Sequence, residues 1–243
     1  MPEPERAALI TGGSSGIGFG IARMLGKDLG YALTVNGRRP DKLEEAVAKL
    51  KDEGIEVTAA PGNMADEDSI KQVVGQHRDT YGRMDVLVNN AGVGIGAAIA
   101  DAETKKLDMQ LDVNLRGVYL VLRESIPMLK EAGHEHKKAL VVNTASIAGK
   151  YGQAWLSMYS ATKFGVVGLS QAAHRELAGD GIQVTAFCPG FVDTAMTDWT
   201  AGSVPKEEMM TPEDIAEAVR FLLRTSPACF VPEIQFIRAG DQM

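Results

Sequence analysis

The chain has 243 residues, 45% of them hydrophobic, and a formal net charge of -7 at pH 7. This negative balance, without a clustered basic stripe, argues against nucleic acid as a partner. No stretch approaches the roughly 20 apolar residues of a membrane span, and the acidic N-terminus does not resemble a signal or transit peptide. Two cysteines, Cys188 and Cys229, do not make a disulfide framework, so we expect reduced thiols in a cytoplasmic protein without a membrane partner.

Apolar runs and amphipathic runs alternate along the whole chain. Short apolar runs predict buried strands, and longer runs with helical periodicity predict helices. Strands are expected at 7–11, 31–37, 55–60, within 84–92, and at 138–146, 182–190 and 233–238. Helices are expected at 16–30, 40–54, 66–82, 103–132, 155–178 and 212–224.

Several residues predict where these helices begin, end or bend. Pro40 stands near the start of the second expected helix and Gly54 at its end, which are the positions that these residue types favour. Thr211 is the expected cap of the last helix. Pro127 lies inside the longest helix, where it predicts a kink or a break.

About seven strands separated by helices predict an α/β fold, a doubly wound, Rossmann-like parallel sheet with helices on both faces. No internal repeat, low-complexity segment or linker divides the chain, so we expect one domain over residues 1–243. Residues 193–210 fit the alternation of strands and helices worst. We expect this segment to be an excursion above the sheet that closes as a substrate lid.

The stretch TGGSSGIG, residues 11–18, connects the first strand to the first helix. Gly12, Gly16 and Gly18 allow a tight turn and a close approach of backbone to a ligand. The N–H groups at the start of the helix can then bind a pyrophosphate, to which the hydroxyl groups of Ser14 and Ser15 can also donate. The alternative is a glycine-rich turn without a ligand, but its position after the first strand favours dinucleotide binding.

Tyr159 and Lys163 in MYSATKFG are four residues apart, so on a helix their side chains share one face. A phenol donates a proton poorly at neutral pH because its pKa is ~10. An ammonium within ~4–6 Å favours the phenolate and lowers this pKa by ~1–3. We therefore expect Lys163 to lower the pKa of Tyr159, which would make its hydroxyl a better proton donor. The alternative is a buried structural tyrosine beside a surface lysine.

Segments that occur in a characteristic order point to one protein family. They are TGGSSGIG (11–18), NNAG (89–92), Asn114 in LDVNLRG, Ser146 followed by YSATK (159–163), and PG (189–190) followed by Thr194. In this order they resemble the short-chain dehydrogenase/reductase family in its single-domain form, and the resemblance covers nearly the whole chain. It implies a nicotinamide-dependent oxidoreductase that acts on an alcohol or a carbonyl compound.

The resemblance also implies roles for individual residues. Tyr159 would be the general acid/base, Lys163 would lower its pKa and hold the nicotinamide ribose, and Ser146 would hydrogen-bond the substrate oxygen. Asn114 would position the water of a proton relay, with a structural amide in its helix as the alternative. The cofactor-binding residues expected are Gly12, Ser14, Ser15, Gly16, Ile17, Gly18, Arg38, Arg39, Asn63, Met64, Asn90, Ala91, Gly92, Tyr159, Lys163, Pro189, Gly190, Val192 and Thr194.

Asn63 is a departure from the family pattern, because many members carry an Asp near the adenine at the corresponding place. The amide oxygen of Asn63 can still accept a hydrogen bond from the adenine amine. Adenine binding is therefore still expected.

The choice of cofactor depends on VNGRRPDK, residues 35–42, which follows the second strand. A carboxylate at the end of this strand would accept from both ribose hydroxyls of NAD and repel a 2′-phosphate, but the strand ends in VNG and offers none. Arg38 and Arg39 follow at once, and a guanidinium makes bidentate, charge-assisted hydrogen bonds to phosphate. We therefore expect NADP(H), with Arg38 as the main contact. Two solvated arginines before a helix are the alternative.

A small or medium carbonyl or alcohol compound is the expected substrate, in a mostly apolar pocket. Its candidate walls are Gly94–Gly96, Lys150, Tyr151, Trp155, Phe191, Met196 and Trp199. The Met and Trp side chains could instead belong to the core or to a subunit interface. Two other functions stay open, a non-catalytic NADP(H)-sensing binding protein and an NAD-dependent alcohol dehydrogenase on the same fold.

Two further expectations concern partners. The family usually pairs its long helices across a two-fold axis, so the resemblance implies a homodimer or homotetramer that pairs helices 103–132 and 155–178. His134 and His136 could in principle bind a metal, but no Cys or further His stands near in the sequence, so no metal site is expected.

Overall fold

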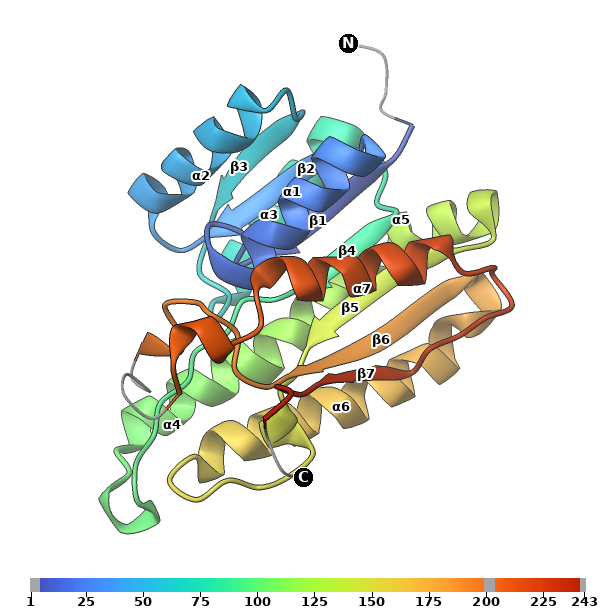
Figure 1. Ribbon diagram of the computed structural model, residues 1–243. Coiled ribbons are helices and arrows are strands. Elements are labelled where there is room, and N and C mark those ends of the chain that lie inside the picture. Colours follow the sequence, from blue (N-terminus) through green and yellow to red (C-terminus); the bar gives the residue numbers. More distant parts are fainter. Residues whose placement is uncertain (1–4, 199–203, 241–243) are drawn as a thin grey trace.

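A computed structural model describes residues 5–198 and 204–240 of the chain (Figure 1). Its centre is a parallel sheet of seven strands in the order β3-β2-β1-β4-β5-β6-β7. The strands are β1 (Ala7–Thr11), β2 (Ala32–Gly37), β3 (Val57–Pro61), β4 (Val86–Asn89), β5 (Ala139–Thr144), β6 (Ile182–Pro189) and β7 (Glu233–Phe236). This arrangement confirms the doubly wound α/β fold that the alternating runs predict.

Helices cover both faces of the sheet (Figure 1). They are α1 (Gly16–Leu29), α2 (Pro40–Asp52), α3 (Glu67–Tyr81), α4 (Thr104–Leu111), α5 (Gly117–His136), α6 (Ser157–Leu177) and α7 (Pro212–Arg224). Helices α1, α2 and α7 pack on one face, and α3, α5 and α6 pack on the other. Ile10 of β1 belongs to the first core and Leu9 to the second, because successive side chains of a strand point to opposite faces.

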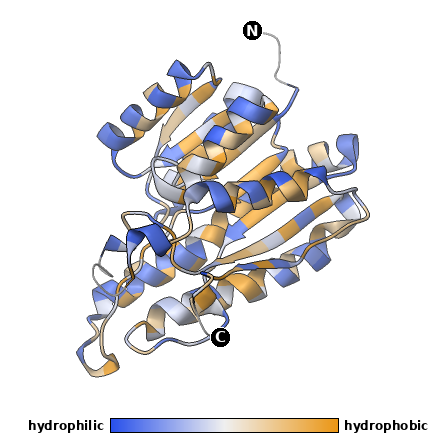
Figure 2. Ribbon diagram, viewed as in Figure 1, coloured by the Kyte–Doolittle hydropathy of each residue, from blue (hydrophilic) through white to orange (hydrophobic). Residues whose placement is uncertain are grey.

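Hydrophobic residues concentrate in the strands, whereas the helices show many polar residues on their outer surfaces (Figure 2). Strands β1, β2, β4, β5 and β6 are buried along their whole length. A strand that is covered on both faces needs apolar side chains at successive positions, which explains the continuous apolar runs in the sequence. Burial of this surface, at roughly 25 cal/mol per Å², is the main force that holds the layers together.

The residues expected to begin and end α2 and to cap α7 do so in the structure. α2 begins at Pro40 and ends at Asp52, two residues before Gly54, which has a φ of 80°. The side chain of Thr211 accepts from the backbone N–H of Asp214, and the Asp214 carboxylate accepts from the N–H of Thr211. This reciprocal cap, typically worth ~1 kcal/mol, fixes the start of α7 as predicted.

Pro127 does not break its helix. α5 continues through Pro127 to His136, because Ser125, Met128 and Leu129 bury this stretch against the sheet and outweigh the lost backbone hydrogen bond. The irregularity lies earlier, in a π-helical segment, η2 (Asp112–Arg116), that joins α4 to α5. The expectation of a break at Pro127 was therefore wrong, and a kink there stays a prediction.

The two described ends of the segment 193–210 lie next to each other beside the sheet. Val192 and Met210 form a parallel bridge at its base, and a short 3₁₀-helix, η6 (Lys206–Glu208), precedes the return. Residues 199–203, which include Trp199, lie outside the described residues. Closure of the segment as a lid stays a prediction.

Within residues 5–198 and 204–240, no helix is long and apolar enough to cross a membrane. In the same ranges no group of three or more His, Cys, Asp or Glu side chains is placed to hold a metal ion. His134 Nε2 lies 3.3 Å from an Asp180 oxygen, and His136 Nε2 lies 2.6 Å from Arg83 Nη2. Both cysteines are free thiols, and the one at the end of β6 is buried.

The buried histidine of α3 makes the stability of this fold sensitive to acid. His77 Nδ1 lies 2.8 Å from Thr34 Oγ1, and Nε2 lies 2.9 Å from the carbonyl oxygen of Arg83. Burial lowers the pKa of His77 to about 4. The unfolded chain takes up this proton near pH ~6.5, so roughly 3 kcal/mol of stability should be lost as pH falls from ~6.5 to ~4.

Urea unfolding measured across this pH range checks the prediction. His77→Gln removes the titrating group, so its unfolding free energy should fall less steeply than that of the wild type. His134→Gln, at an exposed position of α5, should keep the wild-type slope. Equal slopes for His77→Gln and the wild type would show that His77 is not the source.

Candidate active site

The carboxyl ends of the central strands form the place where the two halves of the sheet diverge. β1 and β4 are neighbours, but the chain runs on from β1 to β2 on one side and from β4 to β5 on the other. Ligands of open parallel sheets bind at such switch points. The expected site residues lie at this edge: the glycine turn after β1, Arg38 after β2, Asn90 after β4, Ser146 after β5 and Pro189 at the end of β6.

Glycine is required in the turn between β1 and α1. Gly12 and Gly16 have φ values of 62° and 54°, in the left-handed region that side chains rarely adopt. A Cβ at Gly12 would lie 2.8 Å from the Cα of Ala91, and one at Gly18 would lie 2.5 Å from the carbonyl oxygen of Gly12. The backbone therefore forms a cradle that any side chain would fill.

The NNAG segment holds this turn in place. The Thr11 hydroxyl accepts from the backbone N–H groups of Asn90 and Ala91 at 3.0 and 3.1 Å. The Asn90 amide donates to the carbonyl oxygen of Gly12 at 3.1 Å. Thr194 closes the cradle from above, since a Cβ at Gly16 would lie 2.9 Å from its methyl group.

The start of α1 suits an anion. Ser15 precedes the helix without capping it, so the first N–H groups are not used by a side chain, and the first turn carries no acidic residue. A helix N-terminus of this kind favours phosphate through its free N–H groups and its dipole. The donors and the glycine cradle together fit the pyrophosphate of a dinucleotide.

Arg38 and Arg39 lie exposed directly after β2. Neither side chain makes a hydrogen bond or an ion pair with any residue that the structure describes. Gly37 brings the strand end close to the glycine turn, because a Cβ there would lie 3.1 Å from Ser14 Oγ. Two uncommitted guanidinium groups beside the cradle fit a phosphate on the adenosine ribose.

Tyr159 and Lys163 share one face of α6, as their spacing predicts. Lys163 is only 4% exposed, its Nζ donates to the carbonyl oxygen of Thr144 at 2.8 Å, and it lies 5.5 Å from the centre of the Tyr159 ring. Burial lowers the pKa of Lys163 to about 8. The lysine is therefore a buried cation at the site, and the alternative of a surface lysine was wrong.

The pKa of Tyr159 does not shift in the expected direction in the protein alone. Burial raises the pKa of Tyr159, and a hydrogen bond with Ser146 opposes the rise. The physical reason is that desolvation disfavours the phenolate. The ammonium of Lys163, which is directed to Thr144, does not offset this burial.

Ser146 lies where its hydroxyl can reach both Tyr159 and the end of β6. Its Oγ donates to the carbonyl oxygen of Pro189 at 3.3 Å and accepts from the N–H of Ala148 at 3.1 Å. This second contact starts a short 3₁₀-helix, η3 (Ile147–Gly149). These backbone contacts therefore hold the Ser146 hydroxyl beside the hydroxyl of Tyr159.

Asn114 lies in the π-helical segment, and its side chain is fully buried. Its Oδ1 accepts from the N–H of Val93 at 2.8 Å, while its Nδ2 donates to the Val93 carbonyl at 2.8 Å and to Thr162 Oγ1 at 3.3 Å. The amide therefore clamps the segment after β4. This geometry favours the structural alternative for its side chain, and a role toward water stays a prediction.

The other expected cofactor residues border the same edge. Asn63 Oδ1 accepts from the N–H of Ala65 at 3.2 Å and shapes the turn after β3. Met64 is buried, and its carbonyl oxygen lies 2.3 Å from where a Cβ at Gly117 would be. Gly190 donates to the carbonyl oxygen of Phe236, which ties this segment to β7. The structure places Ile17 in α1, Gly92 in the loop after β4, and Val192 where residues 193–210 leave the sheet.

Only part of the expected substrate pocket comes together. A Cβ at Gly94 would lie 3.8 Å from the Tyr159 ring and 3.9 Å from Met196, and Trp155 packs on Gly96. The side chain of Lys150 points elsewhere, to an ion pair with Glu233 at 2.8 Å. Tyr151 is exposed.

Three residues that support the site were not predicted from the sequence. Thr144 offers Lys163 its carbonyl oxygen, which any residue could do. The Thr162 hydroxyl donates to the Tyr159 carbonyl and accepts from Asn114, and its only signal is its place between the tyrosine and the lysine. Gln110, buried in α4, accepts from the N–H of Ile95 at 3.2 Å, and only its helical spacing of four from Asn114 hinted at it.

Comparison with known proteins identifies the family. Residues 6–202 match the family model described as short chain dehydrogenase. The chain belongs to the short-chain dehydrogenase/reductase family and is an oxidoreductase of the kind that binds a nicotinamide cofactor.

Individual relatives are similar over almost their whole length. A 3-oxoacyl-(acyl-carrier-protein) reductase FabG of Staphylococcus aureus is 36% identical over 228 residues, which cover 89% of this chain and 90% of the relative. An actinorhodin polyketide ketoreductase with NADPH is 33% identical, with a TM-score of 0.85 and 95% of each chain covered. A 3-ketoacyl-(acyl-carrier-protein) reductase from Brucella melitensis complexed with NADH is 29% identical, with a TM-score of 0.86 and 96% of each chain covered.

Proposed function

We propose that the protein reduces a small or medium carbonyl compound with NADPH, and that Tyr159 supplies the proton. The observation that carries this proposal is the meeting of Tyr159, Lys163 and Ser146 beside the glycine cradle at the carboxyl edge of the sheet. The reductase and ketoreductase names of the relatives support the direction of the reaction.

Each side chain has a separate task in this proposal. A bound nicotinamide supplies the hydride, while the protein supplies placement and electrostatics. The Ser146 hydroxyl orients the carbonyl oxygen, where charge develops. The Tyr159 hydroxyl donates its proton to that oxygen, and the Lys163 ammonium stabilises the phenolate that remains. Burial raises the pKa of Tyr159, so the hydroxyl holds its proton in the protein alone, and positive charge beside it is needed to make it a better donor.

The proposed preference for NADPH rests on charge at the adenosine end of the site. Arg38 and Arg39 are exposed and uncommitted, and the strand that precedes them ends without a carboxylate. A 2′-phosphate would therefore meet guanidinium donors and no repulsion. Relatives with NADPH and with NADH are both known, so the preference depends on these residues.

We also propose that two chains pair through α5 and α6. Tyr119 of α5 and Phe164 of α6 expose 54% and 46% of their surfaces. α6 packs against the π-helical segment that leads directly into α5, so the two rings lie on adjoining helices. Aromatic residues are enriched where proteins associate, because they bury much apolar area.

The tyrosine assignment predicts a selective loss. Tyr159→Phe removes only the hydroxyl, so turnover of a good ketone substrate should fall by ~10²–10⁴-fold, the usual contribution of general acid catalysis. Binding of NADPH, followed by its fluorescence, should be nearly unchanged. Tyr119→Phe is the matched control and should keep wild-type turnover. Wild-type kcat in Tyr159→Phe would show that another group donates the proton.

The cofactor assignment predicts a selective weakening. Arg38→Ala should raise the Kd for NADPH on the order of a hundredfold, because a charged hydrogen-bond partner contributes ~2–3 kcal/mol, and should leave the Kd for NADH nearly unchanged. Lys49→Ala removes the same charge from the exposed face of α2 and serves as control. A wild type that prefers NADH, or equal weakening of both cofactors, would contradict the assignment.

The pairing surface predicts a change in mass. Light scattering at micromolar concentration should give a dimer or tetramer for the wild type, and a smaller assembly for the double variant Tyr119→Asp, Phe164→Asp, because two carboxylates would be buried unpaired. Ile99→Asp, at an 80% exposed position away from both helices, should keep the wild-type mass. A monomeric wild type would refute the pairing.

A further inference from the structure

A buried asparagine near the end of β2 lies between the glycine cradle and the segment that follows β3. Asn36 is only 1% exposed, although it belongs to a strand that helices cover on both faces. An amide is costly to bury unless its polar atoms are hydrogen-bonded. The contacts of Asn36 therefore indicate why the strand carries it.

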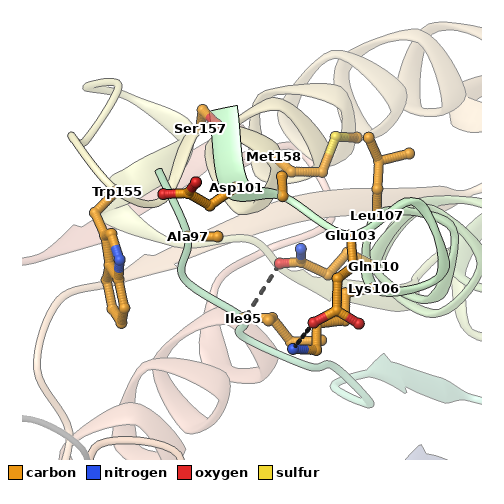
Figure 3. A pocket seen from close by; sticks show the side chains of 11 residues that line it. Ile95, Ala97, Asp101, Glu103, Lys106, Leu107, Gln110, Trp155, Ser157 and Met158 are labelled. Carbon is orange, nitrogen blue, oxygen red and sulfur yellow. Dashed lines mark hydrogen bonds and ion pairs between the residues drawn. The ribbon is translucent and has the colours of Figure 1, made fainter. Parts of the chain in front are cut away.

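The direction in which a dinucleotide would lie follows from the site described above. Its pyrophosphate fits the cradle after β1, and Arg38 lies one strand away, after β2. Tyr159 marks the opposite direction, where Met158, the residue before it, lines a small cavity that Asp101 also borders (Figure 3). A carboxylate disfavours a phosphate there, so the adenosine half would extend over the ends of β2 and β3.

The main chain of Asn36 holds the cradle. Its carbonyl oxygen accepts from the N–H of Gly13 at 2.9 Å, so the end of β2 is bonded to the glycine turn. A Cβ at Gly13 would lie 2.8 Å from Val35 Cγ1, which leaves no room for a side chain between the turn and the strand. The cradle therefore packs directly on the strand that carries Asn36.

The side chain of Asn36 holds the chain where it leaves β3. Its Nδ2 donates to the carbonyl oxygens of Ala60 and Gly62 at 2.9 and 3.2 Å. The N–H of Gly62 donates in turn to the carbonyl oxygen of Gly37 at 3.2 Å. Both N–H groups of the amide are thus used by carbonyl oxygens, and the side chain has no donor left for a ligand.

Helix α3 confines the same segment from the other side. A Cβ at Gly62 would lie 2.6 Å from Val73 Cγ2, and the Ser69 hydroxyl accepts from the N–H of Asn63 at 2.8 Å. Asn63 and Met64, which are expected beside the adenine, follow Gly62 directly. Their position relative to the cradle therefore depends on one residue, whose main chain binds the cradle and whose side chain binds the segment.

We propose that Asn36 is a positioning residue for the cofactor. It sets the distance between the cradle and residues 62–64, and so strengthens binding of the adenosine half without contacting it. This inference rests on the proposed use of a nicotinamide dinucleotide, because it assigns a role toward that same cofactor.

Displacement of the bound reduced cofactor by AMP tests this role without turnover. The cofactor is NADPH or NADH, whichever the wild type binds more tightly, and its fluorescence reports the displacement. AMP spans the cradle and the segment but lacks the 2′-phosphate, so its Kd does not depend on Arg38. Asn36→Ala removes both donors, and Asn36→Asp keeps the shape without them. Each should raise the Kd for AMP about 10-fold, whereas kcat at saturating cofactor should change by less than about twofold.

Thr34→Val is the matched control. Thr34 is buried on the same face of β2, two residues earlier, but its hydroxyl lies 2.8 Å from His77 Nδ1 and touches neither the cradle nor the segment. This variant should lower the Tm, as the Asn36 variants do, and leave the Kd for AMP unchanged. A role of Asn36 in stability alone would leave the Kd unchanged in all three variants.

The outcomes separate this inference from the proposed function. Weaker AMP binding in the Asn36 variants, but not in Thr34→Val, supports the positioning role even if no ketone is reduced, and the proposed function alone then fails. Three results overturn the role even if ketones are reduced. They are a wild-type Kd in either folded Asn36 variant, equal weakening in Thr34→Val, and a wild type from which AMP does not displace the cofactor.

Discussion

The geometry of the site depends on the hydrogen bonds that the Thr11 side chain makes. Its hydroxyl donates to the carbonyl oxygen of Val88 and accepts from the N–H groups of Asn90 and Ala91, so it joins β1 to β4 where the two halves of the sheet diverge. This junction brings the loop after β4 against the turn after β1, and the Cα of Ala91 then leaves room only for glycine at position 12. The shape of the cofactor cradle therefore follows from one buried polar contact in the sheet.

The buried ammonium of Lys163 imposes a second constraint. Lowering the pKa of Lys163 to about 8 corresponds to about 3 kcal/mol of desolvation, which the fold tolerates only with hydrogen bonds to the charge. An ammonium has three donors, and the Thr144 carbonyl uses one of them. Asn114 holds the loop after β4 close by, since a Cβ at Gly92 would lie 3.6 Å from Lys163 Nζ. We propose that the remaining donors bind ribose hydroxyls of the cofactor beside the cradle.

Much of this arrangement could be predicted because it follows from periodicity and from backbone conformation. Continuous apolar runs determine the doubly covered strands, and glycine spacing determines the turn. The π-helical segment could not be predicted, because a single widened turn leaves the apolar pattern of its helix almost unchanged. The prediction of a break at Pro127 failed for a related reason. Burial of the neighbouring side chains outweighs the tendency of proline to end a helix. The pKa of Tyr159 rises because burial, which spacing does not reveal, exceeds the effect of a lysine directed elsewhere.

The two ends of the site differ in charge, although the chain as a whole is negative. Arg38 and Arg39 follow β2 at one end, without carboxylate partners in the described part of the chain. Asp101 and the neutralised pair of Glu103 with Lys106 border the other end. Local charge, and not the net charge, determines where an anion binds, because screening limits these effects to about 8–10 Å. A polyanionic cofactor is therefore attracted to the β2 side and to the start of α1, and not to the end that Asp101 borders.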